Sequence, residues 1–150
     1  MLPATQSRRA GTTEAPNVFK NRPEVAPVDA EFKSALAQEI EALGSLDKNW
    51  DSYGAPPIDP KIISAGVKFI YSLPGHLAQR PRVVPMSPGN FQLEWHRGRK
   101  ILELEFETPT TIRFLQWNGD QNFSVEDTIG IDEIGRVVDL NQWFTSGTCP

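Results

Sequence analysis

The chain has 150 residues and a formal net charge of −4, and 39% of its residues are hydrophobic. This length suits one domain with a single core. No apolar run approaches the roughly 20 residues that a membrane-spanning helix needs, so no membrane segment is expected. The acidic balance disfavours direct binding to DNA or RNA, because nucleic-acid affinity comes mainly from Lys and Arg side chains that neutralise phosphates. The single cysteine, Cys149, excludes an internal disulfide and a multi-thiolate metal site.

The composition of the two ends differs from that of the middle. Residues 1–27 combine Thr, Ser, Pro, Gly and Arg with few aromatic or branched side chains, which predicts a disordered tail. Residues 28–146 are expected to form one domain, and residues 147–150 a frayed terminus. Arg8 and Arg9 are not followed by an apolar segment, so the start lacks the plan of a secretory signal and a cytoplasmic location is expected.

Two helices are expected in the first half of the domain. The first begins at Asp29, which suits the N-cap, and ends at Gly44. The second begins at Asp59 and Pro60 and ends before Pro74-Gly75. Both carry apolar residues every three or four positions, at Phe32, Leu36, Ile40 and Leu43 in the first, and at Ile62, Ile63, Val67, Ile70 and Leu73 in the second.

From Arg82 onward apolar and polar residues alternate, and turn signals recur, which predicts an antiparallel meander. The expected strands are 82–86, 91–96, 100–107 and 111–117, with 122–127 as a fifth in the longer version of the sheet.

A last helix follows the strands. Its apolar side is expected to carry Ile131, Ile134, Val138 and Phe144, and its polar side Asp132, Glu133, Arg136 and Asp139. The predicted fold class is therefore α+β, with two N-terminal helices, a four- to five-stranded antiparallel meander sheet and one C-terminal helix, the helices packing on one sheet face.

Two neighbouring strands predict an acidic sheet face. The apolar residues Phe91, Leu93, Trp95, Leu102, Leu104 and Phe106 alternate with the polar residues Gln92, Glu94, His96, Glu103, Glu105 and Glu107. A short hairpin loop after the first of these strands brings like faces together, so the glutamates share the outer face. Carboxylates that face one another across strands repel, so a counter-charge is expected nearby.

The fourth strand supplies this counter-charge in one of two registers. In the register that we favour, Ile112 and Phe114 join the core and Arg113 lies beside Glu105 or Glu107. The other register turns Arg113 inward together with the next two residues of the same face. In the favoured register an apolar patch is exposed beside the acidic row, which is typical of protein-binding faces. This patch consists of Leu115 and Trp117.

A second candidate region is the loop that joins the two first helices. It contains Trp50, Asp51, Tyr53 and Gly54, followed by two prolines. Asp51 has a local reason to be present as a turn acceptor, and Trp50 as a plug of the core edge. Alternatively, Trp50 and Tyr53 offer an amphipathic platform for a peptide or small ligand, with Asp51 as an acceptor.

The string Asn49-Trp50-Asp51-Ser52-Tyr53-Gly54-Ala55, followed by Pro57-Ile58, Leu93-Glu94-Trp95 and Leu102-Glu103-Leu104-Glu105, resembles a group of small uncharacterised bacterial and phage proteins. The resemblance covers residues 36–144, and these proteins often carry Gly where this chain has Ser52. It implies an accessory protein, carried by a phage or mobile element, and transfers no activity and no catalytic residue.

No catalytic set, cofactor or metal site is predicted. Cys149 lies at the terminus, His76 has no second histidine at metal-ligand spacing, and no phosphate-binding glycine motif occurs. The leading hypothesis is a small acidic binding protein that docks on a protein with a basic surface, in an inhibitor or antitoxin-like role. The alternatives are a metal-dependent hydrolase that uses the glutamates with His96, and a small-ligand binder that uses the Trp50 and Tyr53 loop.

Overall fold

The computed structural model describes residues 25–74 and 79–146. The chain divides into two parts, residues 1–32 and 33–150, and the sheet and nearly all the helices belong to the second part. The predicted tail up to residue 24, His76 and the C-terminal residues with Cys149 lie outside the described residues.

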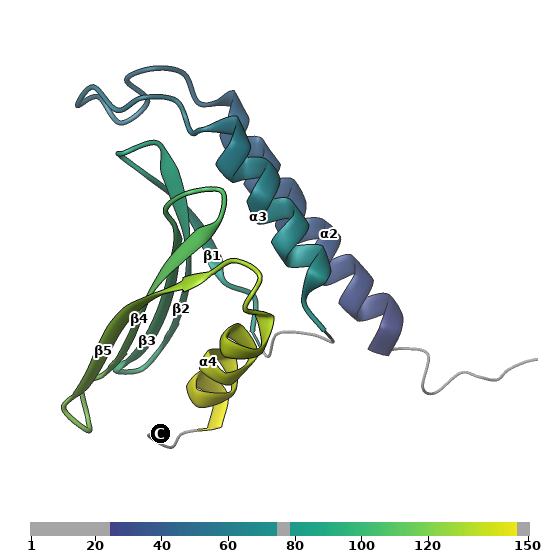
Figure 1. The fold of residues 1–150 in the computed structure, drawn as a ribbon, viewed down its shortest axis with the longest axis vertical. Coiled ribbons are helices and arrows are strands. Elements are labelled where there is room, and N and C mark those ends of the chain that lie inside the picture. The colour runs from purple at the N-terminus through teal and green to yellow at the C-terminus, as the bar shows by residue number, and fades with distance from the viewer. Residues whose placement is uncertain (1–24, 75–78, 147–150) are drawn as a thin grey trace, which may run out of the picture. The chain divides into compact units, whose positions relative to one another are not determined.

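Three α-helices and five strands make up the described fold (Figure 1). The helical elements are α2 (Val25–Ala42), a short 3-10 turn η3 (Leu43–Ser45), α3 (Pro60–Ser72) and α4 (Ile134–Ser146). The strands are β1 (Arg82–Met86), β2 (Asn90–Arg97), β3 (Lys100–Phe106), β4 (Thr111–Asn118) and β5 (Phe123–Gly130).

The predicted α+β class is confirmed. The strands form one antiparallel sheet in the order β1-β2-β3-β4-β5, and each strand pairs with the next one along the chain. The fifth strand is present and extends three residues past its predicted end. Helices α3 and α4 lie on the same side of the sheet, as Figure 1 shows. We call the face toward these helices the inner face and the opposite one the outer face.

The inner face is apolar along its whole middle. Phe106 stacks on Phe91 with ring centroids 4.6 Å apart, and Phe69 of α3 meets Phe106 edge-on at 5.2 Å. Gly66 lets α3 come this close, since a Cβ at this position would lie 2.5 Å from the Phe91 ring. Gly66 is therefore a position of close packing between α3 and the sheet.

Helix α3 begins as predicted. Asp59 is its N-cap and accepts a hydrogen bond from the Lys61 N–H at 2.9 Å, and Pro60 is its first residue. Helix α2 begins at Val25, four residues before the predicted cap at Asp29. The helix therefore runs through the predicted cap position instead of starting there.

The prediction for the buried side of α4 is only partly correct. Phe144 is buried, but Val138 is half-buried and Ile131 precedes the helix. The buried face is instead made by Val137, Leu140, Trp143 and Phe144. These residues recur every three or four positions, so the apolar stripe is helical but lies on other residues than those expected.

Cations of the β2–β3 hairpin cap the C-terminal carbonyls of α4. Arg97 donates to the Phe144 carbonyl at 2.6 Å, and buried Lys100 donates to the Trp143 carbonyl at 2.7 Å. Such contacts satisfy carbonyls that have no partner within the helix and favour the negative end of its dipole. These contacts hold the C-terminal end of α4 on the β2–β3 hairpin.

Among the described residues, no helix combines the length and the apolar character needed to cross a membrane.

Candidate functional site

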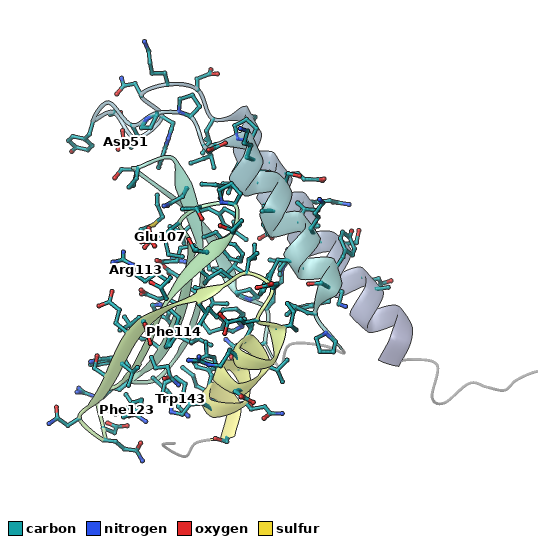
Figure 2. All side chains as sticks on the ribbon, in the orientation of Figure 1. Asp51, Glu107, Arg113, Phe114, Phe123 and Trp143 are labelled. Carbon is teal, nitrogen blue, oxygen red and sulfur yellow. The ribbon has the colours of Figure 1, made fainter. Side chains whose placement is uncertain are left out.

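Strand β4 adopts the register that the sequence favoured. Ile112 and Phe114 are buried in the core, and Arg113 lies opposite Glu105 on the outer face. Figure 2 shows Arg113 and Glu107 near each other on the side of the sheet away from the helices. The predicted counter-charge is therefore located on the acidic face.

Arg113 connects carboxylates of β3, of the residue that follows β3, and of β5. Its guanidinium lies 2.6 Å from Glu105, 3.3 Å from Glu107 and 3.4 Å from Glu126, measured between nitrogen and oxygen atoms. The hydrogen bond to Glu105 is the main reason that the pKa of Arg113 is raised. A permanent cation thus holds three carboxylates of the outer face together.

Glu105 is the structural centre of this cluster. Its side chain is only 10% exposed, and besides Arg113 it accepts a hydrogen bond from the Asn90 amide at 3.2 Å. A carboxylate this shielded needs such partners, because burial of an uncompensated charge is costly. Glu105 is therefore better suited to support the face than to meet a partner.

Glu94 has its own set of partners. It accepts from Arg82 at 2.7 Å and from the Gln92 amide at 2.6 Å, and the His96 imidazole lies 3.6 Å away. Its side chain is also only 10% exposed. Glu94 is thus the second satisfied carboxylate of the face.

Glu103 differs from these neighbours. It lies opposite Glu94 on one side and Leu115 on the other, and within the described residues no hydrogen bond or ion pair reaches its carboxylate. Its pKa is raised, first by partial burial and next by the charge of Glu94. Of the predicted glutamates, Glu103 is the one whose charge is not compensated by a contacting cation.

A shallow depression surrounds this carboxylate. It has a volume of about 250 Å³ and carries both carboxylates and apolar side chains. Its lining residues are Met86, Gln92, Glu103, Glu105, Arg113, Phe114, Leu115 and Glu126.

The predicted apolar patch is less exposed than expected. Leu115 and Trp117 are both half-buried rather than exposed. The Arg99 guanidinium lies over the Trp117 ring, 5.7 Å from its centroid, and so covers part of it. The patch is a partly shielded apolar surface next to the acidic depression.

The loop between the first helices is held by its own side chains. The Asp51 carboxylate accepts hydrogen bonds from the Tyr53 and Ala55 N–H groups at 2.8 and 3.0 Å, and these bonds lower the pKa of Asp51. Asn49 accepts from the Gly54 N–H at 2.7 Å. Gly54 has φ +90°, a conformation that favours glycine. Asp51 and Gly54 thus have turn-forming roles.

The two aromatic residues of the loop lie in different environments. Trp50 is half-buried against the core, and its indole N–H donates to the Pro56 carbonyl at 2.8 Å. Tyr53, by contrast, is 91% exposed. These contacts fit the plug role for Trp50 and leave Tyr53 open to solvent, so the two do not form one platform within the described structure.

Several participants of the outer face were not named from the sequence. Arg82 holds Glu94 together with Gln92, which the alternation had already placed on this face, and Glu126 shares Arg113. The alternation of residues along β5 could place Glu126 on one face of the sheet. The sequence did not determine how this strand pairs with β4, so the contact with Arg113 could not be predicted. Arg82 could be placed only once β1 was known to pair with β2 so that Arg82 lies opposite Glu94.

Within residues 25–74 and 79–146, no group of three or more His, Cys, Asp or Glu residues is arranged to hold a metal ion. Comparisons with family models, curated proteins and solved structures found no match for this chain. The resemblance carried by the Asn49–Ala55 string therefore stays a prediction.

Proposed function

We propose that this protein is a small non-catalytic binding protein that docks through the outer face of its sheet on a protein with a basic surface. The observation that carries this proposal is Glu103, a partly buried carboxylate that no cation of the described residues contacts, on a sheet face that no described helix covers. An acidic depression beside partly exposed apolar side chains suits a basic side chain from outside.

The energetics favour a partner cation at this position. Without a partner, the ionised form of Glu103 is destabilised by partial burial and by repulsion from Glu94, as its raised pKa indicates. A guanidinium or ammonium group brought by a partner offsets both costs and forms a charge-assisted hydrogen bond. Glu94 and Glu105 do not offer the same gain, because Arg82 and Arg113 already hold them.

The surroundings of Glu103 match the rest of an interface. Leu115 and Met86 line the same depression, and Trp117 lies on the same strand face two residues beyond Leu115. Apolar and aromatic contacts supply most of the binding energy of protein interfaces, whereas charges guide encounter and specificity. The stem of an Arg or Lys side chain therefore has apolar surface to cover.

The biological role that we attach to this face is that of an inhibitor or antitoxin-like accessory protein in the cytoplasm, encoded by a phage or mobile element. A row of carboxylates can imitate the charge of a phosphate backbone, so a nucleic-acid-binding protein is the kind of target that such a face would block. The affinity should then fall steeply as salt is added.

The test is affinity capture from a lysate of the source organism with two charge-matched triple variants. One removes charge from the outer face, by Glu103→Gln, Glu107→Gln and Glu126→Gln. The other removes the same charge from α2, the loop and α4, by Glu41→Gln, Asp47→Asn and Asp139→Asn, all exposed residues. Thermal melts of both variants check that each is folded.

We expect one protein to be retained at low salt by wild type and by the control variant, and to be lost from the outer-face variant and at higher salt. Equal retention by the two variants, or no protein whose retention depends on the outer face, contradicts the proposal.

A further inference from the structure

A groove separate from the outer face lies along α3. Its volume is about 710 Å³, and one wall is α3 while the other is the β3–β4 turn and the segment that leads into α4. This volume falls in the range of roughly 300 to 1,000 Å³ that is typical of small-molecule sites. No sequence pattern indicates this groove.

The floor of the groove is apolar and fixed. Phe69 is buried and packs on Phe106 of the sheet, and Ile131 and Ile134 of the opposite wall are partly buried against the core. The Ile131 N–H donates to the Thr110 carbonyl at 2.9 Å, which ties this wall to the β3–β4 turn. The groove is therefore preformed, so binding a ligand does not require the protein to become more ordered.

The rim carries charges of both signs. Lys61 and Lys68 stand on the α3 wall, two helical turns apart, and both are exposed. Among the described residues neither ammonium group has a carboxylate or carbonyl partner. Asp132 lies on the opposite wall and is also exposed.

The groove is elongated rather than round. Its α3 wall runs from Pro60 to Ser72, which is about 18 Å at 1.5 Å per residue. An elongated apolar floor fits an extended hydrocarbon chain better than a compact ring. Lys61 and Lys68, which no carboxylate of the described residues contacts, supply the complementary charge for a carboxylate on this edge.

We infer that this groove binds a free amphipathic carboxylate with a single hydrocarbon chain. The chain lies over Phe69, Ile131 and Ile134, and the carboxylate pairs with Lys68 on the α3 edge. Asp132 disfavours the reversed orientation, because it would repel a carboxylate placed on the other wall. This inference does not depend on the proposed function, since the groove shares no residue with the outer-face depression.

The test is calorimetric titration of the full chain with octanoate, decanoate and dodecanoate below their micelle concentrations, with decanol as the neutral probe. We expect the carboxylates to bind and affinity to rise with chain length, by up to about fourfold for each fully buried methylene. Decanol should bind more weakly than decanoate, because it cannot pair with the lysines.

Three variants assign the binding to this groove. Lys68→Gln should weaken decanoate binding by about fivefold or more, whereas Lys48→Gln, which removes the same charge from an exposed loop position, should leave it unchanged. Asp132→Asn should strengthen binding. Ala65→Phe should abolish it by filling the groove, with a thermal melt to show that the variant is folded.

Absence of decanoate binding overturns the inference, as does equal binding of decanoate and decanol. Equal affinity in wild type and Lys68→Gln overturns it too. If Ala65→Phe does not fold, the opposite effects of Lys68→Gln and Asp132→Asn still decide the matter.

Discussion

The inner face of the sheet and two carboxylates of its outer face are both shielded from water, but for different reasons. On the inner face, Phe91 and Phe106 are covered by helices. On the outer face no described helix is present, and yet the side chains of Glu94 and Glu105 are each only 10% exposed. They are shielded by their own partners on neighbouring strands.

The two faces therefore differ in what a shielded side chain needs around it. An apolar side chain needs only matching volume around it, so packing decides the inner face. A carboxylate needs a donor or cation in the right place, so the outer face depends on pairing across strands. Glu103 is shielded without being paired, which is why we assign it to contact with a partner.

The largest expected loss of stability comes from a substitution on the inner face. Phe106→Ala should lower the free energy of unfolding by about 3 to 5 kcal/mol, because it leaves a cavity between Phe91 and Phe69. Urea denaturation of wild type and variant measures it. A loss below about 1 kcal/mol would mean that Phe106 is not a central core residue.

A smaller loss is expected for the supporting carboxylate of the outer face. Glu105→Gln keeps the size of the side chain but removes the charge that pairs with Arg113, so unfolding free energy should fall by about 1 to 2 kcal/mol. The matched control Glu41→Gln, at an exposed position of α2, should stay within about 0.5 kcal/mol of wild type. Equal values for the two variants would show that the Arg113 cluster adds no stability.

The smallest expected effect on the free energy of unfolding is that of Glu103→Gln. It is identified by how its sign depends on pH. Because the pKa of Glu103 is raised in the folded protein, the folded state binds this proton more tightly than the unfolded state. Stability from this group is therefore greatest at acidic pH and falls as pH rises through the raised pKa. Glu103→Gln removes the fall, so the variant should gain on wild type as the pH rises from below the unfolded-state pKa through the raised folded-state pKa.

Urea denaturation of both proteins at several pH values measures this gain. A variant that loses ground on wild type as pH rises would show that Glu103 is already paired in the folded protein, and the argument for an external cation would no longer stand.

Much of the fold could be predicted because its signals are local. The alternation in β2 and β3 placed Leu93 and Leu104 inward and Glu94 and Glu103 outward, and the register confirms this. The Asp59 cap followed by Pro60 placed the start of α3. These signals need no knowledge of the rest of the chain.

The parts that could not be predicted depend on contacts between distant residues. The C-terminal end of α4 is held by Lys100 and Arg97, some forty residues earlier in the chain. The partial burial of Trp117 depends on Arg99 of another hairpin. The groove along α3 brings together residues of α3, a strand turn and the α4 approach, which no single periodicity connects.

The central claim is that Glu103 meets a cation of a partner on the outer face. The most direct measurement is the dissociation constant of the captured partner for wild type, Glu103→Lys and Glu41→Lys, two variants with the same net charge. The account predicts that Glu103→Lys weakens binding by more than about tenfold and that Glu41→Lys binds as wild type does. Equal affinities of the two lysine variants would contradict it.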